Sequence, residues 1–318
     1  MITSPLCKLL EIDLPILQGG MAWVSDAGLA AAVSNAGGLG IIAGGTSPAE
    51  MVLSEIRKAK TLTSKPFGVN IMLMSPHADA LAQVIADEKV DVVTTGAGNP
   101  TKYMEAWTKA GVKVIPVVAS TAVAKLTARC GAVALIAEGG ESGGHIGEIT
   151  TMALIPQICD AVDLPIIAAG GIADGRGVAA AFMLGAVGVQ VGTAFLVAKE
   201  CNIHQTYKNK VIRAKDIDTI TTGKRLGHPV RSLKTPFSRG LFKKEYDSTI
   251  SDKDLEALGI GALKRAVIDG DEQNGCFLAG QVSGMIKKEQ TAEEIIQGIF
   301  HGAEELLISY AKSFVTAP

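Results

Sequence analysis

The chain has 318 residues, of which 47% are hydrophobic, 19% charged and 4% aromatic. This composition excludes a disordered or coiled-coil protein and indicates a core of aliphatic side chains. A net charge of −2 and a pI near 6.2 give no global electrostatic reason to expect a nucleic-acid partner. The five cysteines lack CxxC spacing, so we predict no metal site and thiols typical of a reducing cytosol.

The N-terminal segment gives no indication of export, because Lys8, Glu11 and Asp13 interrupt the apolar stretch that a signal peptide needs. Residues 177–198 carry no formal charge over 22 positions, a length that would cross a bilayer. The segment contains four glycines and a central LGAVG, which is typical of a helix end followed by a strand. We therefore expect a buried helix and strand, no membrane span and a cytoplasmic protein.

The first two thirds of the chain alternate short apolar runs with segments of helical composition. Several helical segments start on Ser, Thr or Asp and finish at Gly, as capped helices do. Eight such units favour a closed (β/α)8 TIM barrel in the α/β class over an open doubly wound sheet, although periodicity alone does not prove closure. The predicted strands are residues 15–19, 39–43, 66–72, 91–95, 112–118, 132–137, 164–169 and 187–191.

The sequence becomes more charged from about residue 198 onward, which suggests that the chain has two parts. Residues 1–197 would form the barrel core, and residues 198–318 an appended helical region packed on it, serving as a lid or a subunit contact. The helices expected in this region are residues 208–214, 252–269, 280–287 and 291–313.

Glycine-rich turns follow the first, seventh and eighth predicted strands. In barrels of this kind the site lies at the C-terminal ends of the strands, and phosphate is commonly held after strands seven and eight. Glycine lets the backbone approach a ligand, and N–H groups at the following helix starts point at anions. We predict a phosphate cradle, while tight turns without a ligand remain the alternative. The predicted cradle consists of Gly170, Gly171, Gly192 and Thr193.

Polar residues at the same rim are candidates for chemistry. The loop from Glu138 to Gly147 follows strand six, holds five glycines and carries His145, which suits acid–base work near neutral pH if it is not a plain surface residue. Asn70 ends strand three and would pair its amide with a ligand or cap its own loop. Gln190 lies inside VGVQVG and needs a polar partner at the barrel top.

A basic segment begins at Lys224 and ends at Lys244, with seven Lys or Arg and no acidic residue. It would receive an acidic protein or the phosphates of a pyridine nucleotide, or it is a solvated surface loop. Motifs for nucleotide hydrolysis, zinc proteolysis and serine acyl transfer are absent from the sequence.

Six strings, in order, closely resemble the FMN-dependent enoyl-acyl-carrier-protein reductases. That group lies within the larger nitronate monooxygenase, or 2-nitropropane dioxygenase, superfamily. The resemblance covers the whole barrel and continues through RAKDIDT, GALKRAVIDGD and FLAGQVSG. The six strings are QGGMAWVSDAGLAAAVSNAGGLGIIAGG, KPFGVNIMLMSP, VVTTGAGNPTKYM, IAEGGESGGHIG, LPIIAAGGIADG and VQVGTAF.

The resemblance implies FMN at the barrel mouth, with Met21 and Ala22 near the ring and Asn70 and Glu138 on its polar side. Hydride from NADH or NADPH would reach a trans-2-enoyl thioester through the cofactor. His145 matches the histidine of the GGH motif, and its role in enoyl reduction stays open. The full set of cofactor-binding residues implied is Gly20, Met21, Ala22, Asn70, Glu138, Gly143, Gly170, Gly171, Gln190, Gly192 and Thr193.

Further expectations come from the same resemblance. A monovalent cation is known to activate members of the group, but its ligands are not identifiable here. The acidic acyl carrier protein would suit the segment from Lys224 to Lys244, and a homodimer is expected. The main alternative is a nitronate monooxygenase, which uses the same barrel, FMN and histidine but passes electrons to oxygen. A barrel that binds a phosphorylated ligand without catalysis is the alternative of a different class.

Overall fold

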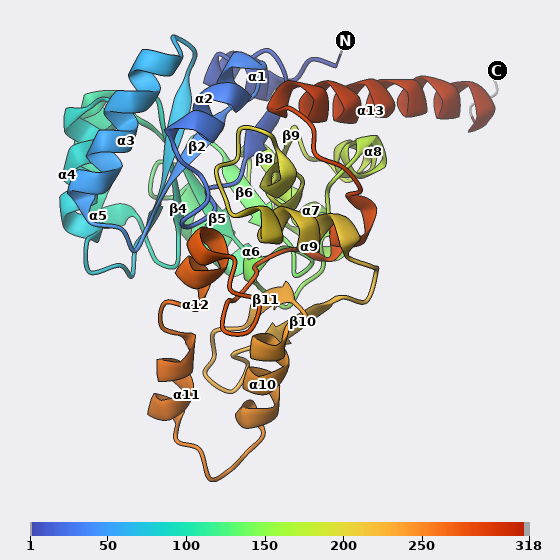
Figure 1. Cartoon of the computed structure of the whole chain (residues 1–318). Coiled ribbons are helices and arrows are strands. Elements are labelled where there is room, and N and C mark those ends of the chain that lie inside the picture. The colour runs from blue at the N-terminus through green and yellow to red at the C-terminus, as the bar shows by residue number, and fades with distance from the viewer. Residues whose placement is uncertain (1, 315–318) are drawn as a thin grey trace.

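The computed structural model describes residues 2–314, and its centre is a sheet of eight parallel strands in the order β1-β9-β8-β6-β5-β4-β3-β2 (Figure 1). Backbone hydrogen bonds from Gln18 to Leu39 at 3.0 Å and from Leu39 to Ile16 at 2.9 Å join the two ends of this sheet. The predicted (β/α)8 barrel is therefore confirmed. Its strands are β1 (Ile16–Gln18), β2 (Gly40–Gly45), β3 (Phe67–Met72), β4 (Val92–Gly96), β5 (Lys113–Val118), β6 (Leu135–Glu138), β8 (Ile166–Ala169) and β9 (Gly188–Val191).

The barrel is filled by aliphatic side chains that alternate along the strands, such as Leu17, Ile41 and Ile136, all buried. Buried parallel strands need apolar residues on both faces, which explains their near-continuous Val, Ile and Ala. The short helix α1 (Pro5–Leu10) adds Leu6 and Leu10 to this cluster. The barrel is thus a packed core rather than a pore, and only its opposite rim is left for a ligand.

Seven helices follow the strands of the first two thirds. Several begin at a side-chain cap, as predicted: Asp26 accepts a hydrogen bond from the Leu29 N–H, and Asp174 from the Arg176 N–H. Residues 177–198 fold into parts of α8, β9 and a 3-10 turn, and no helix among residues 2–314 has the length and apolar character to cross a membrane. The helices are α2 (Ala27–Asn35), α3 (Ala49–Leu62), α4 (Ala78–Asp87), α5 (Thr101–Ala110), α6 (Thr121–Ala128), α7 (Thr151–Cys159) and α8 (Gly175–Met183).

The segment after residue 197 contains strands as well as the expected helices. β10 (Thr219–Thr222) pairs antiparallel with β11 (Val230–Leu233), which in turn pairs with β7 (Gly144–His145) of the glycine-rich loop. The region therefore holds helices, as predicted, together with a small antiparallel sheet that the sequence did not predict. Its other elements are η1 (Thr193–Val197), α9 (Gln205–Arg213), α10 (Pro236–Glu245), α11 (Asp252–Gly259), α12 (Ala262–Lys264), a π turn (Arg265–Asp269) and η3 (Gln281–Met285).

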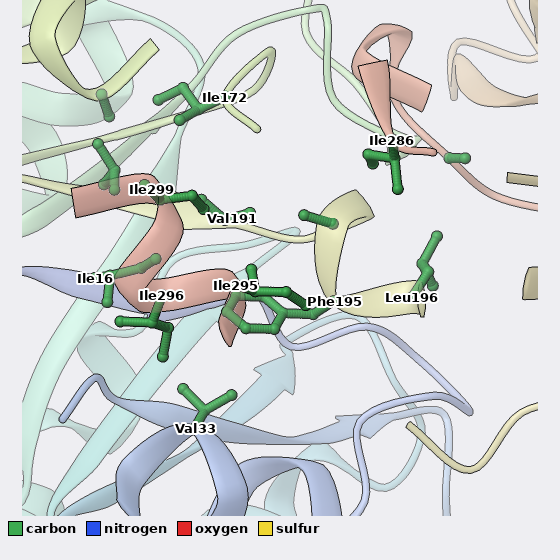
Figure 2. Packing of buried hydrophobic residues seen from close by; sticks show 14 of the residues in the cluster. Ile16, Val33, Ile172, Val191, Phe195, Leu196, Ile286, Ile295, Ile296 and Ile299 are labelled. Carbon is green, nitrogen blue, oxygen red and sulfur yellow. The ribbon is translucent and has the colours of Figure 1, made fainter. Parts of the chain in front are cut away.

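The last helix, α13 (Ala292–Phe314), packs against α8 and α2 and lies in the helical layer of the barrel (Figure 1). Ile295, Ile296 and Ile299 point from α13 toward the strand region around Val191 and toward Phe195 (Figure 2). At the crossing with α8, a Cβ on Gly175 would lie 2.2 Å from a backbone nitrogen of α13. Segments on both sides of residue 197 therefore build one core. The division into residues 1–197 and 198–318 stays a prediction, and Met1 and residues 315–318 lie outside the described residues.

Candidate active site

One cavity of about 710 Å³ opens at the C-terminal ends of the strands. This is the rim where barrels of this class place their sites, and the volume falls in the ordinary range for small-molecule pockets. Every site residue predicted from sequence lines this cavity, although the residues come from the ends of strands that are far apart along the chain. They are Gly20, Met21, Ala22, Asn70, Glu138, Gly143, His145, Gly170, Gly171, Gln190, Gly192 and Thr193.

The turn after β1 is shaped by close packing against the end of β3. A Cβ on Gly20 would lie 2.3 Å from the Asn70 Cβ, so only glycine fits there. Asn70 Nδ2 donates a hydrogen bond to the Thr94 hydroxyl at 2.9 Å. One N–H of the amide is thus satisfied within the protein, and it fixes the side chain while leaving the amide oxygen free for a ligand.

The turns after β8 and β9 form the floor on the opposite side of the cavity. Gly170 and Gly171 both have positive φ, 89° and 72°, a backbone conformation that favours glycine. A Cβ on Gly170 would also lie 2.6 Å from the Gly139 carbonyl oxygen. After β9, Thr193 begins the 3-10 turn η1, where the first N–H groups lack partners within the turn. These are the properties expected of an anion cradle.

The glycine-rich loop after β6 is held by hydrogen bonds and close packing on several sides. The Glu141 carboxylate accepts hydrogen bonds from the Thr151 N–H at 2.9 Å and from the Thr151 hydroxyl at 2.9 Å. Arg231 of β11 donates from Nη2 to the Gly140 carbonyl at 2.9 Å. On the third side, a Cβ on Gly143 would meet the backbone of Ala279 at 2.6 Å. The glycines permit close packing of the loop rather than movement.

His145 lies at the mouth of the cavity with an exposed side chain. Its position is set by the pairing of β7 with β11, in which His145 opposes Val230. His228 also lines the cavity. Partial desolvation in the concave mouth, together with the charge of His228, lowers the pKa of His145 from its ordinary value. The imidazole is therefore neutral at pH 7 and has one nitrogen free to accept a proton.

Glu138 closes β6 at the cavity wall, and burial raises the pKa of its carboxyl to about 7, against the opposing effect of the nearby Ser142 hydroxyl. Within residues 2–314 the Ser142 hydroxyl lies near the Glu138 carboxyl but forms no hydrogen bond of ordinary geometry. Gln190 is also buried, with 8% of its surface exposed. The wall thus offers three polar groups with unused hydrogen-bonding capacity, which is typical of a surface that meets a polar ligand.

The C-terminal segment supplies a second part of the cavity wall that the sequence did not predict. His228 and Pro229 come from the basic segment, and Leu278, Ala279 and Val282 from the FLAGQVSG string. The Gly280 N–H donates to the Thr193 hydroxyl at 3.0 Å, which ties this wall to the predicted cradle. The only sequence signals were the histidine in GHPVR and the tail part of the family resemblance.

The cations of the basic segment do not gather at the cavity. Arg225 forms an ion pair with Asp252 at 2.8 Å and donates to carbonyls of the loop before α11. Arg231 contacts the glycine-rich loop, and Lys234 donates to the Ile217 carbonyl. Arg239, Lys243 and Lys244 lie exposed on α10. Arg225, Arg231 and Lys234 therefore stabilise the fold, whereas the three cations on α10 are exposed.

Fold and cavity together define a barrel protein that binds a small molecule at the carboxyl ends of its strands. The sequence profile described as "Nitronate monooxygenase" matches residues 3–83 and 78–302. The chain therefore belongs to the nitronate monooxygenase family of oxidoreductases, and the family expected from sequence is confirmed.

Three comparisons place the chain within that family. A solved structure of FabK from Thermotoga maritima is 47% identical, with a TM-score of 0.96, and the match covers 99% of this chain and 100% of that one. A 5-hydroxy-7a-methyl-1-oxo-octahydro-1H-indene-4-carboxyl-CoA dehydrogenase of Rhodococcus jostii is 34% identical over 94% of this chain and 95% of its own. A probable nitronate monooxygenase of Staphylococcus aureus is 30% identical over 95% of this chain and 98% of its own.

Proposed function

We propose that the protein is an FMN-dependent reductase that uses NADH or NADPH to reduce trans-2-enoyl thioesters carried by acyl carrier protein. This would be the last step of the fatty acid elongation cycle. The observation that carries the proposal is the meeting of two glycine turns, three polar groups and His145 around one cavity. The family strings of the sequence analysis support the same activity.

The residues present fit FMN. The positive-φ glycines at 170 and 171 and the start of η1 suit a phosphate, and Asn70, Glu138 and Gln190 suit the polar edge of a flavin. The cavity of about 710 Å³ is large enough for a cofactor of this size and part of a substrate. FMN would supply hydride transfer between a pyridine nucleotide and the enoyl thioester, chemistry that no side chain provides.

The chain's own residues would bind and orient the substrate and transfer a proton to it. Neutral His145 at the cavity mouth can take up a proton from solvent on its free imidazole nitrogen and then release that proton to a substrate carbon. The Glu138 carboxyl titrates near neutral pH, so its charge depends on what lies beside it. Leu278 and Val282 give the wall an apolar surface suited to an acyl chain and limit water at the site.

The relatives support a thioester substrate over a nitronate. The chain is 47% identical to FabK and 34% identical to an enzyme named for a carboxyl-CoA compound, which is a thioester. It is 30% identical to a probable nitronate monooxygenase. Nitronate oxidation with oxygen is the second candidate, because the family profile bears that description.

Two measurements on the purified protein separate these candidates. A flavin absorption spectrum, followed by fast oxidation of NADH or NADPH on addition of crotonyl thioester, is the result expected for the reductase. Oxygen uptake with an alkyl nitronate and no response to the thioester would overturn it in favour of the monooxygenase. A colourless protein that takes up no added FMN would contradict both.

The remaining expectations extend the same proposal. The acyl carrier protein would dock through the segment from Lys224 to Lys244, of which α10 offers the exposed cations. Activation by a monovalent cation, a homodimer and a cytoplasmic location remain predictions of the family resemblance. The choice between NADH and NADPH is decided by the same kinetic measurement, run with each nucleotide.

A further inference from the structure

A second cavity, of about 300 Å³, lies on the other side of α9 from the cavity described above. Thr206, Asn209, Lys210 and Arg213 are spaced three and four residues apart, so they share one face of α9, and all four line this cavity. An adjacent face carries Tyr207, which is fully buried, lines the large cavity and donates to the Leu278 carbonyl at 2.6 Å. One helix therefore separates the two cavities.

The walls of the second cavity carry more positive than negative charge. Four cations line it, from α9, from the residue after β11 and from α10: Lys210, Arg213, Lys234 and Arg239. Two carboxylates, Asp218 and Glu272, also line it. The difference, four minus two, leaves a net charge of +2.

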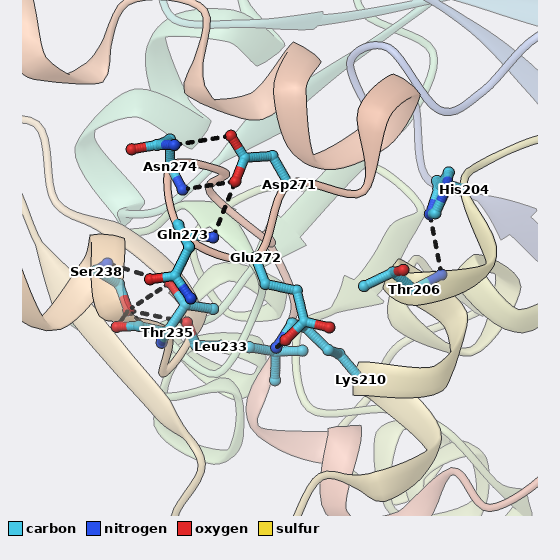
Figure 3. A network of polar contacts seen from close by, with 10 residues as sticks. All are labelled: His204, Thr206, Lys210, Leu233, Thr235, Ser238, Asp271, Glu272, Gln273 and Asn274. Atoms are coloured by element: carbon cyan, nitrogen blue, oxygen red, sulfur yellow. Dashed lines mark hydrogen bonds and ion pairs between the residues drawn. The ribbon is translucent and has the colours of Figure 1, made fainter.

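Both carboxylates already have partners in the protein. Glu272 forms an ion pair with Lys210 at 2.8 Å, and Figure 3 shows the two side chains meeting beside Leu233. Asp218 Oδ2 accepts a hydrogen bond from the Lys215 N–H at 2.9 Å. Glu272 is therefore paired with Lys210, while Asp218 keeps its charge but forms no ion pair with either arginine among residues 2–314.

Arg213 and Arg239 are the cations without such partners. Among residues 2–314, neither guanidinium forms a hydrogen bond or an ion pair. They come from different helices, α9 and α10, and face the same hollow. Each guanidinium presents a planar set of five N–H donors, a geometry that matches two oxygens of one phosphate group.

We propose that this second cavity is a binding site for a phosphate ester, with Arg213 and Arg239 as its principal ligands. Thr206 and Asn209 add uncharged donors on the same face of α9. A volume of about 300 Å³ accommodates a phosphate group with part of the molecule that carries it, but not a whole dinucleotide. The proposal does not depend on the reductase activity, because it concerns a different cavity and different residues.

The test is calorimetric titration of the full chain, saturated with FMN, with inorganic pyrophosphate. The wild type is expected to bind one equivalent, and the double variant Arg213→Gln/Arg239→Gln to bind it at least about tenfold more weakly. Arg129→Gln is the matched control, since Arg129 is also exposed and lines neither cavity. Equal affinity in the double variant and the wild type, or equal weakening in the control, would overturn the proposal.

Two further arms identify the source of the phosphate. Adenosine 2′-monophosphate represents a free nucleotide, and 4′-phosphopantetheine represents the prosthetic group of a carrier protein. The supporting result is that either compound competes with pyrophosphate in the wild type and fails to do so in the double variant. The compound that competes then identifies the kind of molecule that carries the phosphate. Competition by neither would overturn its assignment to phosphate esters. Thermal unfolding of the double variant should match the wild type, because both arginines are exposed and unpaired within residues 2–314.

Discussion

The floor and the outer wall of the large cavity are built in different ways. The floor consists of turns that directly follow barrel strands, such as Gly170–Gly171 after β8 and Thr193 after β9. The wall, with His228 and Leu278, comes from the segment after residue 197 and is joined to the floor by contacts between distant residues. The Gly280–Thr193 hydrogen bond spans 87 positions, and the Arg231–Gly140 contact spans 91.

This difference separates two tasks. Backbone turns with positive φ or close packing form a rigid floor that suits a cofactor held permanently. The wall depends on the pairing of β11 with β7. This pairing is short, because β7 has only two residues. His145 lies at the junction, because it belongs to the barrel loop and is positioned by the wall. Changes at the junction, the floor and the wall should therefore have distinct effects.

The largest effect is expected at the junction. His145→Ala should lower the rate of enoyl thioester reduction by at least about 100-fold, the usual contribution of a general acid, while leaving bound FMN unchanged. Stopped-flow measurement of the two half-reactions with crotonyl thioester checks this. His77→Ala, outside the cavity at the start of α4, is the control and should keep full activity. Full turnover in His145→Ala would remove His145 from the chemistry.

Next in size is the floor. Gly170→Ala combines an unfavourable positive φ with a collision against the Gly139 carbonyl, so we expect a loss of about 3 kcal/mol in the free energy of unfolding and loss of FMN. Gly111→Ala is the matched control, because Gly111 has φ 81° with no neighbour within 4 Å of the added Cβ. It should lose about 1 kcal/mol by conformational strain alone. Equal losses in urea unfolding would show that close packing of the floor is unimportant.

Glu138, at the end of β6, gives the large cavity a pH dependence. Its pKa is 4.5 in the ordinary state and about 7 in the fold. Because the folded pKa is raised, the stability given by the neutral carboxyl is complete below pH 4.5 and is lost as the pH rises through 7. Glu138→Gln avoids this loss. Relative to wild type without FMN, it should gain at most about 3 kcal/mol between about pH 5 and about pH 8 in urea unfolding. A difference that is the same at both pH values would contradict the assignment.

The smallest effect concerns the outer surface of the wall segment. Lys243→Glu/Lys244→Glu should raise KM for an enoyl group on acyl carrier protein by roughly threefold to tenfold, with no change for the same enoyl group on coenzyme A, because rim charges mainly steer association. Lys58→Glu, at an exposed position on α3, should change neither. If KM for the carrier protein does not respond, or responds equally in the control, docking through this segment is wrong.

The floor could be predicted from sequence because it depends on neighbours along the chain. Each βα unit carries its own apolar strand, turn glycines and helix cap, so the order of Gly170, Gly171 and Thr193 already places them at one rim. The bounds of most strands differ from the prediction by only a few residues.

The wall could not be predicted, because its elements have no local pattern. β10 and β11 have four residues each, TITT and VRSL, and their polar and charged residues do not alternate regularly. Their partner β7 is a two-residue strand inside a glycine loop, so the pairing depends on tertiary contacts. The packing of α13 in the helical layer of the barrel could not be predicted for a similar reason, because about 100 residues separate α13 from β9.

The central claim is that the glycine turns after β8 and β9 hold the phosphate of FMN and thereby set the flavin beside His145. A crystal structure of the protein with FMN tests it most directly. We expect phosphate oxygens at hydrogen-bond distance from backbone N–H groups of Gly171 and Thr193, with the ring facing Met21. A flavin bound elsewhere, or a floor that remains without ligand while FMN is bound, would contradict it.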